Sequence, residues 1–449
     1  MQDLTTGPVT RHLIKTSSFM LVTMVVQTMY ILVDLYWVGH LGTDAVAAVG
    51  IAGNISFIVL ALTQMLGVGT TTLVSHAAGQ KDHERVLLVF NQSQVLSTLA
   101  GLALLIVGMA TRRAYTASVG ADAATAALAN DYLLWFIPAM ALQFLMVAMG
   151  AALRGLGQFK PGMIVSTATI AINMALAPVL IFGWGTGHPM GVAGAAVATL
   201  ISIVVGVIWL TTYFLDNDSF LTFTPRDWSP QLGLWKKMLG IGLPSGAEFG
   251  LMAVYLVFIY SIIKPFGAEA QAGFGIGGRV VQAGFMPVVA LGFAVAPVAG
   301  QNVGAKLGAR VRETYRSAVM LVVVVMTLFA VLCHVAPQAF IGIFSSDPRV
   351  IAVGTDYLKI VSWNYIASGV IFVNSSMFQA LGNTVPSLVT SAVRLIIVAV
   401  PVVWLSQHPG LQLNWIWYLS VASVLFQLAL SLWLLRRELT RTLGVARPS

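Results

Sequence analysis

Charged residues are scarce in this chain. They make up 9% of its 449 residues, whereas a soluble protein of that length carries roughly 25%. Hydrophobic residues make up 58% and the mean hydropathy is +0.86. The long apolar runs therefore predict an all-α polytopic membrane protein, with room for about twelve spans of ~20 residues. The net charge of +8 does not indicate a nucleic-acid partner, because Lys and Arg are scattered through short loops.

Catalytic and cofactor motifs are also missing. The single cysteine, Cys333, excludes an internal disulfide framework and a cysteine-based metal site. No G-x-x-x-x-G-K-[ST] sequence occurs, so the chain has no obvious means of hydrolysing ATP. "GFGIGG" at 273–278 fits a dinucleotide-binding turn but follows no strand, which favours close packing of helices. We therefore expect no enzymatic activity and no cofactor.

Apolar runs predict twelve membrane-spanning helices. They lie at 13–38, 48–74, 86–110, 130–153, 162–183, 191–215, 236–263, 273–300, 313–335, 354–380, 386–405 and 413–435. An even number of spans leaves both termini on one side. Seventeen Lys and Arg fall in the loops and tails of that side and five on the opposite side. The positive-inside rule then predicts a cell (inner) membrane protein with both termini in the cytoplasm.

The chain matches itself when it is shifted by 225 residues. The matching stretches include "LGTDAVAAVGIAG" at 41–53 with "FGAEAQAGFGIGG" at 266–278, and "DYL" at 131–133 with "DYL" at 356–358. The constant shift predicts two parallel six-helix lobes, residues 1–215 and 236–449, joined by a cytoplasmic linker at 216–235. Two such lobes with a cleft between them would suit alternating access.

The first predicted helix carries an aspartate, Asp34, within an otherwise apolar run. An aspartate at a helix centre costs about 2.5–3.5 kcal/mol on insertion scales, so its default interpretation is functional. Asp34 is the last member of a polar stripe whose residues are spaced by 4, 3 and 4 positions: Thr23, Gln27, Tyr30 and Asp34. Such a stripe should face a watery cavity rather than lipid. Because burial disfavours the charged carboxylate, Asp34 could bind and release a proton during transport. The structural alternative is that Asp34 pairs with a buried donor or snorkels outward.

Other charges in or near the spans have two interpretations each. Glu248 and Arg394 lie at similar predicted depths, and an ion pair between them would lower the cost of burying both. The alternative is that Glu248 and Arg394, with Gln27, line the substrate cleft. Asp131 and Asp356 follow polar loops, so we expect both to cap the first turn of a helix.

Four stretches resemble the multidrug and toxic compound extrusion (MATE) family of antiporters. They are "LVDLYWVGHLGTDAVAAVG" at 32–50, "ALRGLGQFKPGMIVSTATIAINMALAPVLIFG" at 152–183, "GAEAQAGFGIGGRV" at 267–280 and "MFQALGNTVPSLVTSAVRLIIVAVP" at 377–401. With the spans and the repeat, the resemblance covers nearly the whole chain. It implies two six-helix lobes that export organic cations in exchange for H⁺ or Na⁺.

The resemblance also implies an ion-coupling site. Its residues are the acid of the first helix, the tyrosine one turn earlier, and the polar residues of the fifth and sixth helices: Asp34, Tyr30, Asn173 and Thr199. The family often has a second carboxylate four residues after the asparagine, where this chain has Ala177. We therefore expect Asp34 to couple transport to H⁺. The alternative is Na⁺ bound at Asp34 and Asn173.

The function expected is a secondary active multidrug efflux transporter for lipophilic, mostly cationic compounds. Aromatic and Met side chains of an apolar cleft would contact such compounds by dispersion and cation–π attraction. Expected partners are these compounds and the lipid bilayer, with no nucleic acid, and we expect a monomer. A flippase for a lipid-linked precursor is the alternative, but it would need clustered Arg and Lys. The first lobe has no basic residue deep in a span, and the second has only Arg279 and Arg394. A non-transporting membrane enzyme or scaffold is disfavoured by the repeat.

Overall fold

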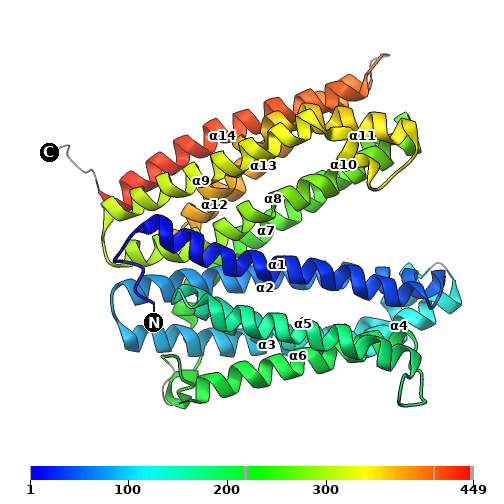
Figure 1. The fold of residues 1–449 in the computed structure, drawn as a ribbon. Coiled ribbons are helices and arrows are strands. Elements are labelled where there is room, and N and C mark those ends of the chain that lie inside the picture. Colours follow the sequence, from blue (N-terminus) through cyan, green and yellow to red (C-terminus); the bar gives the residue numbers. More distant parts are fainter. Residues whose placement is uncertain (1, 121, 217–219, 408–409, 445–449) are drawn as a thin grey trace. The chain divides into compact units, whose positions relative to one another are not determined.

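A computed structural model describes residues 2–120, 122–216, 220–407 and 410–444. These residues form helices and no strands (Figure 1). The first half holds α1 (Val9–Gly39), α2 (Thr43–Gly79), α3 (His83–Val119), α4 (Ala123–Gly155), α5 (Phe159–Phe182), α6 (Val192–Leu215) and η1 (Pro225–Trp228). The second half holds α7 (Leu232–Ile263), η2 (Lys264–Phe266), α8 (Ala268–Gly304), α9 (Gly308–Val335), α10 (Pro337–Gly342), α11 (Pro348–Val361), η3 (Ser362–Asn364), α12 (Tyr365–Ala380), α13 (Val385–Ser406) and α14 (Leu413–Leu443).

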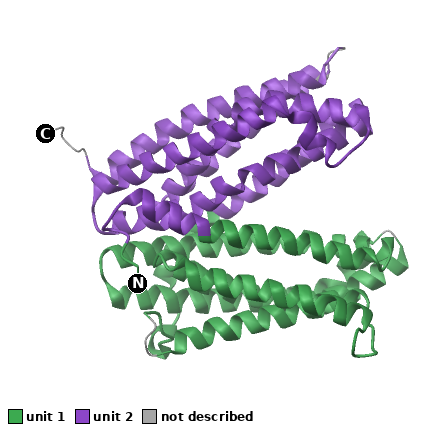
Figure 2. Ribbon diagram, in the orientation of Figure 1, with its two compact units in different colours: residues 1–3, 19–243 green, residues 4–18, 244–449 purple. Residues whose placement is uncertain are grey.

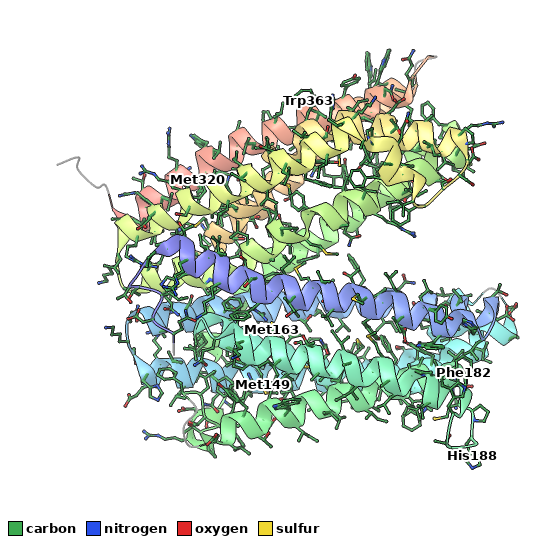
Figure 3. The ribbon with its side chains drawn as sticks, in the orientation of Figure 1. Met149, Met163, Phe182, His188, Met320 and Trp363 are labelled. Carbon is green, nitrogen blue, oxygen red and sulfur yellow. The ribbon has the colours of Figure 1, made fainter. Side chains whose placement is uncertain are left out.

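Eleven helices in the described part of the chain are long and apolar enough to cross a membrane. Many of their large apolar side chains are exposed, as expected of surfaces that face lipid tails. Met320 on α9 is an example, with 63% of its surface exposed (Figure 3). The chain is therefore a multi-pass membrane protein, as the composition predicts.

The tenth predicted span, 354–380, differs from the expectation of one continuous helix. It is divided into α11 and α12 by η3, and neither helix reaches the length of a span. The hydroxyl of Ser362 donates to the carbonyl of Lys359 at 2.8 Å, a local bond that competes with regular helix geometry. Trp363 lies in this break and is 71% exposed (Figure 3).

The predicted helix caps at Asp131 and Asp356 are wrong, because both residues lie inside helices α4 and α11. Each helix begins eight residues earlier, and the aspartate just before it accepts a hydrogen bond from the backbone of the first turn. Asp122 accepts from the backbone N–H of Thr125 at 2.7 Å, and Asp347 accepts from that of Arg349 at 2.8 Å. The hydrogen bond from Thr125 holds the pKa of the exposed Asp122 carboxyl below its usual value.

The internal repeat extends to backbone conformation. Residues with positive φ recur at the shift of 225 in four pairs: Gly42 and Gly267 (104° and 97°), Lys81 and Lys306 (58° and 59°), Gly157 and Gly382 (74° and 78°), and Gly185 and Gly410 (77° and 105°). The lysine pair is informative, because few residues other than glycine adopt a positive φ. The two halves therefore share turn geometry as well as sequence.

The chain forms two compact units (Figure 2). Unit 1 contains residues 1–3 and 19–243, and unit 2 contains 4–18 and 244–449. Both divisions fall inside a helix, at 18/19 in α1 and at 243/244 in α7, and these two points are also 225 residues apart. The start of each half's first helix thus packs in the other unit. We call these two segments, 4–18 and 232–243, the arms.

The two arms are held by different means. In unit 2, the N–H of Leu4 donates to Oε1 of Gln301 at 3.0 Å, and Arg310 donates to the carbonyl of Gly7 at 2.9 Å. In unit 1, α7 approaches α2 so closely that a Cβ at Gly242 would overlap the carbonyl oxygen of Met65. Arm 4–18 is held by hydrogen bonds, whereas arm 232–243 combines the indole hydrogen bond of Trp235 to Gln92 with a close approach that leaves no room for a side chain at Gly242.

The predicted linker, 216–235, contains η1, and its residues 217–219 lie outside the described residues. Two fully buried side-chain amides of α3 form hydrogen bonds to residues 220–235 of this linker. Oδ1 of Asn91 accepts from the indole of Trp228 at 3.1 Å, and Oε1 of Gln92 accepts from that of Trp235 at 2.8 Å. Residues 220–235 of the connection are therefore an ordered part of unit 1.

Candidate ion-coupling site

A polar cluster lies inside unit 1, where α1, α4, α5 and α6 contribute side chains. Asn173 on α5 and Thr199 on α6 are both buried. The amide Nδ2 of Asn173 donates to Oγ1 of Thr199 at 3.0 Å, and that hydroxyl donates to the carbonyl of Ala195 at 3.1 Å. Thr199 thus uses its proton within its own helix and serves Asn173 as an acceptor.

Helix α1 adds Tyr30 and Asp34 to this cluster. The side chain of Tyr30 interacts with the hydroxyl of Thr199, and it also lies within electrostatic range of Asp34. The structure therefore brings together Tyr30, Asp34, Asn173 and Thr199, which are four residues far apart in the sequence. The first two residues of the predicted stripe contribute less: Gln27 is exposed, and the hydroxyl of Thr23 donates to the carbonyl of Phe19 in its own helix.

Two acceptor oxygens in the cluster have no hydrogen-bond donor among the described residues. Oδ1 of Asp34 and Oδ1 of Asn173 are buried, and neither has a hydrogen-bond partner among the residues that the structure describes. Buried acceptors without a donor are costly. A proton on Asp34 would convert one acceptor into a donor, and a carboxylate or amide oxygen can also ligate a hard cation. The chemistry of the cluster therefore suits a small positive species.

The position of the family's second carboxylate is apolar here. Ala177 is 1% exposed and belongs to a hydrophobic cluster that includes Val38 and Ala195. Across residues 2–120, 122–216, 220–407 and 410–444, no group of three His, Cys, Asp or Glu side chains could hold a metal ion. Asp34 is thus the carboxylate of this cluster.

One member of the cluster was not among the predicted site residues. Tyr132 on α4 is 4% exposed and interacts electrostatically with both Tyr30 and Asp34. The signal that could have found it is the repeated "DYL": Tyr132 and Tyr357 are 225 residues apart, and so are Tyr30 and Tyr255. The shift thus pairs tyrosines at two positions of the site.

Glu248 on α7 has a separate set of partners in unit 2. Oγ of Ser387 lies 2.9 Å from its Oε2, and Oγ of Ser391 donates to its Oε1 at 2.9 Å. Ser375 on α12 extends the network, since its Oγ lies 2.8 Å from that of Ser387. The carboxylate is therefore solvated by hydroxyl groups in place of water.

The ion pair expected between Glu248 and Arg394 is wrong. Within the described residues, ion pairs join Arg349 to Glu269 and Arg441 to Glu438, and none includes Arg394. The serines already satisfy Glu248. The guanidinium of Arg394, about one turn beyond Ser391 on α13, lies over the ring of Tyr255 at 4.9 Å from its centroid.

Comparisons with known proteins agree with this architecture. The family model described as MatE matches residues 20–179 and 244–405. The chain is 27% identical over 403 residues to the "Probable multidrug resistance protein YoeA" of Bacillus subtilis (strain 168), covering 89% of this chain and 87% of that protein. It is 24% identical over 437 residues to the "Multidrug export protein MepA" of Staphylococcus aureus (strain MRSA252), covering 97% of this chain and 96% of that protein.

A solved structure has the same fold. It is the outward-facing conformation of a multidrug resistance MATE family transporter of the MOP superfamily. The TM-score is 0.89 with 24% sequence identity, and the match covers 98% of each chain. This likeness concerns the fold alone.

Proposed function

The chain belongs to the MatE family, and from this premise we propose that it is a secondary active transporter that exports lipophilic, mostly cationic compounds in exchange for H⁺. The names of YoeA and MepA support multidrug export. The protein lies in the cell (inner) membrane with both termini in the cytoplasm, and it acts as a monomer by alternating access. Its lobes, predicted at 1–215 and 236–449 and with the two arms exchanged, are the moving parts.

Asp34 is the coupling carboxylate in this proposal. The observation that carries it is the buried Oδ1 of Asp34, an acceptor without a partner in the described part of unit 1. A charged carboxylate there is costly, and protonation removes the charge and supplies the missing donor. Na⁺ would want several oxygen ligands. Only Asp34 and Asn173 offer an unpartnered oxygen in the cluster, which favours H⁺.

Transport by purified protein in liposomes tests the proposal. The probe is rhodamine 123, a fluorescent lipophilic cation, under a pH gradient without Na⁺ and under a Na⁺ gradient without a pH difference. Wild type should move the dye under the pH gradient, and Asp34→Asn should not. The matched control is Asp131→Asn, an exposed aspartate on α4, which should transport normally. Undiminished transport by Asp34→Asn would exclude this mechanism.

A further inference from the structure

A surface pocket lies in unit 2 where α9 ends and α10 begins, beside α11. Its volume is about 340 Å³, and its lining residues are Val335, Ala336, Pro337, Gln338, Ala339 and Lys359. Sites for small ligands occupy roughly 300–1,000 Å³, so this pocket is large enough for a polar headgroup. The coupling site lies in unit 1, and the proposed function gives this pocket no role.

Lys359 gives the pocket a positive charge. It is exposed on α11, and the lining contains no acidic residue among those that the structure describes. Asp356 lies one turn earlier on the same helix and is also exposed, but neither residue takes part in an ion pair in the described ranges. The ammonium group of Lys359 and the amide of Gln338 are the side-chain donors of the lining. The pocket therefore suits an anionic ligand.

The surroundings place this pocket at a membrane boundary. α9 is a membrane-spanning helix, and its last residue, Val335, is part of the pocket lining. Trp363 follows Lys359 by four residues and is 71% exposed (Figure 3). Its ring packs edge-on against that of His334, with 5.6 Å between the centroids. Because exposed Trp side chains gather at the level of lipid headgroups, the pocket faces the headgroup layer.

An apolar stripe of α9 leads away from the pocket. Its members follow one another at spacings of 4, 4, 3 and 4 residues, so they share one face of the helix, and each is more than half exposed: Met320, Val324, Leu328, Val331 and Val335. The stripe is roughly 22 Å long at 1.5 Å per residue. That length exceeds half of the ~30 Å hydrocarbon core, so the stripe can accompany an acyl chain through one leaflet.

We propose that this pocket binds an anionic phospholipid. Lys359 and Gln338 hold its phosphate group, and one acyl chain lies along the stripe of α9 from Val335 to Met320. A zwitterionic headgroup fits less well, because it brings a cation of its own to a pocket that already holds an ammonium group. Inorganic phosphate offers the same group to Lys359 but no chain to the stripe. This lipid site goes beyond the proposed function, since it involves neither the coupling ion nor the exported compound.

Photocrosslinking tests the proposal. Purified full-length protein is placed in phosphatidylcholine vesicles that contain phosphatidylglycerol with a diazirine in its acyl chain. After illumination, mass spectrometry should find labelling concentrated in the second half of α9 and in the segment from Lys359 to Trp363. Lys359→Gln should reduce this labelling by roughly 5-fold. The matched control is Lys264→Gln, at an exposed lysine of η2, which should leave the labelling within about 2-fold.

Both lysines are exposed, so neither substitution should prevent folding. The same diazirine carried by phosphatidylcholine should label this region less than the phosphatidylglycerol probe does. Equal labelling by the two probes would overturn the choice of an anionic lipid, and unchanged labelling of Lys359→Gln would overturn the site. Loss of labelling in inorganic phosphate, with no loss in the same concentration of chloride, would show that the pocket takes free phosphate in place of a lipid.

Discussion

Unit 1 and unit 2 carry the same pair of tyrosines with opposite polarity around them. Tyr30 and Tyr132 lie beside Asp34 in unit 1. Their counterparts at the shift of 225, Tyr255 and Tyr357, lie beside Arg394 in unit 2. The difference shows that one scaffold of helices can present either an acid or a base against the same phenol groups.

The remaining unit 1 site residues have apolar counterparts. At the shift of 225, Asp34 corresponds to Ile259, and Asn173 and Thr199 correspond to Val398 and Val424. All three apolar side chains are buried, at 1%, 0% and 1% exposure. At these three positions the second repeat has therefore replaced hydrogen-bonding groups by packing.

The largest expected effect comes from placing the acid in the wrong repeat. Ile259→Asp should destabilise the protein by ~3 kcal/mol or more, because an unpaired carboxylate would be buried among apolar side chains. It should also fail to restore pH-driven transport to Asp34→Asn. Denaturant unfolding in micelles and the liposome assay measure the two outcomes.

Ile259→Val is the control for packing at this position and should cost about 0.5–1.5 kcal/mol. If Ile259→Asp folded stably and restored coupling in the Asp34→Asn background, the two repeats would be interchangeable, and the contrast between them would not hold.

A smaller effect is expected from the two charges of unit 2. Glu248→Gln should lower the free energy of unfolding by ~1–3 kcal/mol, because the serine hydroxyls lose a charged acceptor. Its effect and that of Arg394→Gln should add within about 0.5 kcal/mol, since the side chains have separate partners. Unfolding of the two single variants and the double variant measures this.

Glu248→Gln combined with Ser391→Ala provides the comparison, because these residues are in contact and their effects should not add. A large interaction energy between Glu248→Gln and Arg394→Gln would show that the two charged groups are in contact. The charge of Arg394 would then be neutralised by Glu248.

The smallest expected effect distinguishes the two tyrosines of the repeated "DYL". Tyr132→Phe should slow pH-driven efflux of rhodamine 123 by roughly 5-fold, equivalent to ~1 kcal/mol, because a hydroxyl beside Asp34 is lost. Tyr357→Phe should leave that rate unchanged, since Tyr357 lies beside Arg394. Initial rates in liposomes measure both, and equal slowing would contradict a division of roles between the units.

Much of the fold could be predicted from composition and from the shift of 225, because lipid restricts spanning segments to apolar helices. The break at η3 could not, since residues 361–365 contain no proline or glycine to mark it. The helix starts were missed because polar residues continue the helices beyond the apolar runs, so that Asp122 rather than Asp131 is the cap.

The site was only partly accessible from the sequence. Asp34 is conspicuous because an acid is rare in an apolar helix. Tyr132 is not conspicuous, because a tyrosine in an apolar helix usually contributes to packing. The partners of Glu248 were hidden for another reason: Ser387 and Ser391 are common residues, and only the tertiary packing of α7 against α13 gives them a role.

The exchanged arms have a consequence for the order in which the protein is made. Unit 1 lacks its arm, 232–243, until the ribosome has passed the middle of the chain. Unit 2 has the reverse history, because its arm, 4–18, is the first segment to emerge and must wait for α8 and α9. Neither half can therefore complete its packing alone. A gene cut between the halves should yield stable protein only when both fragments are synthesised in the same cell.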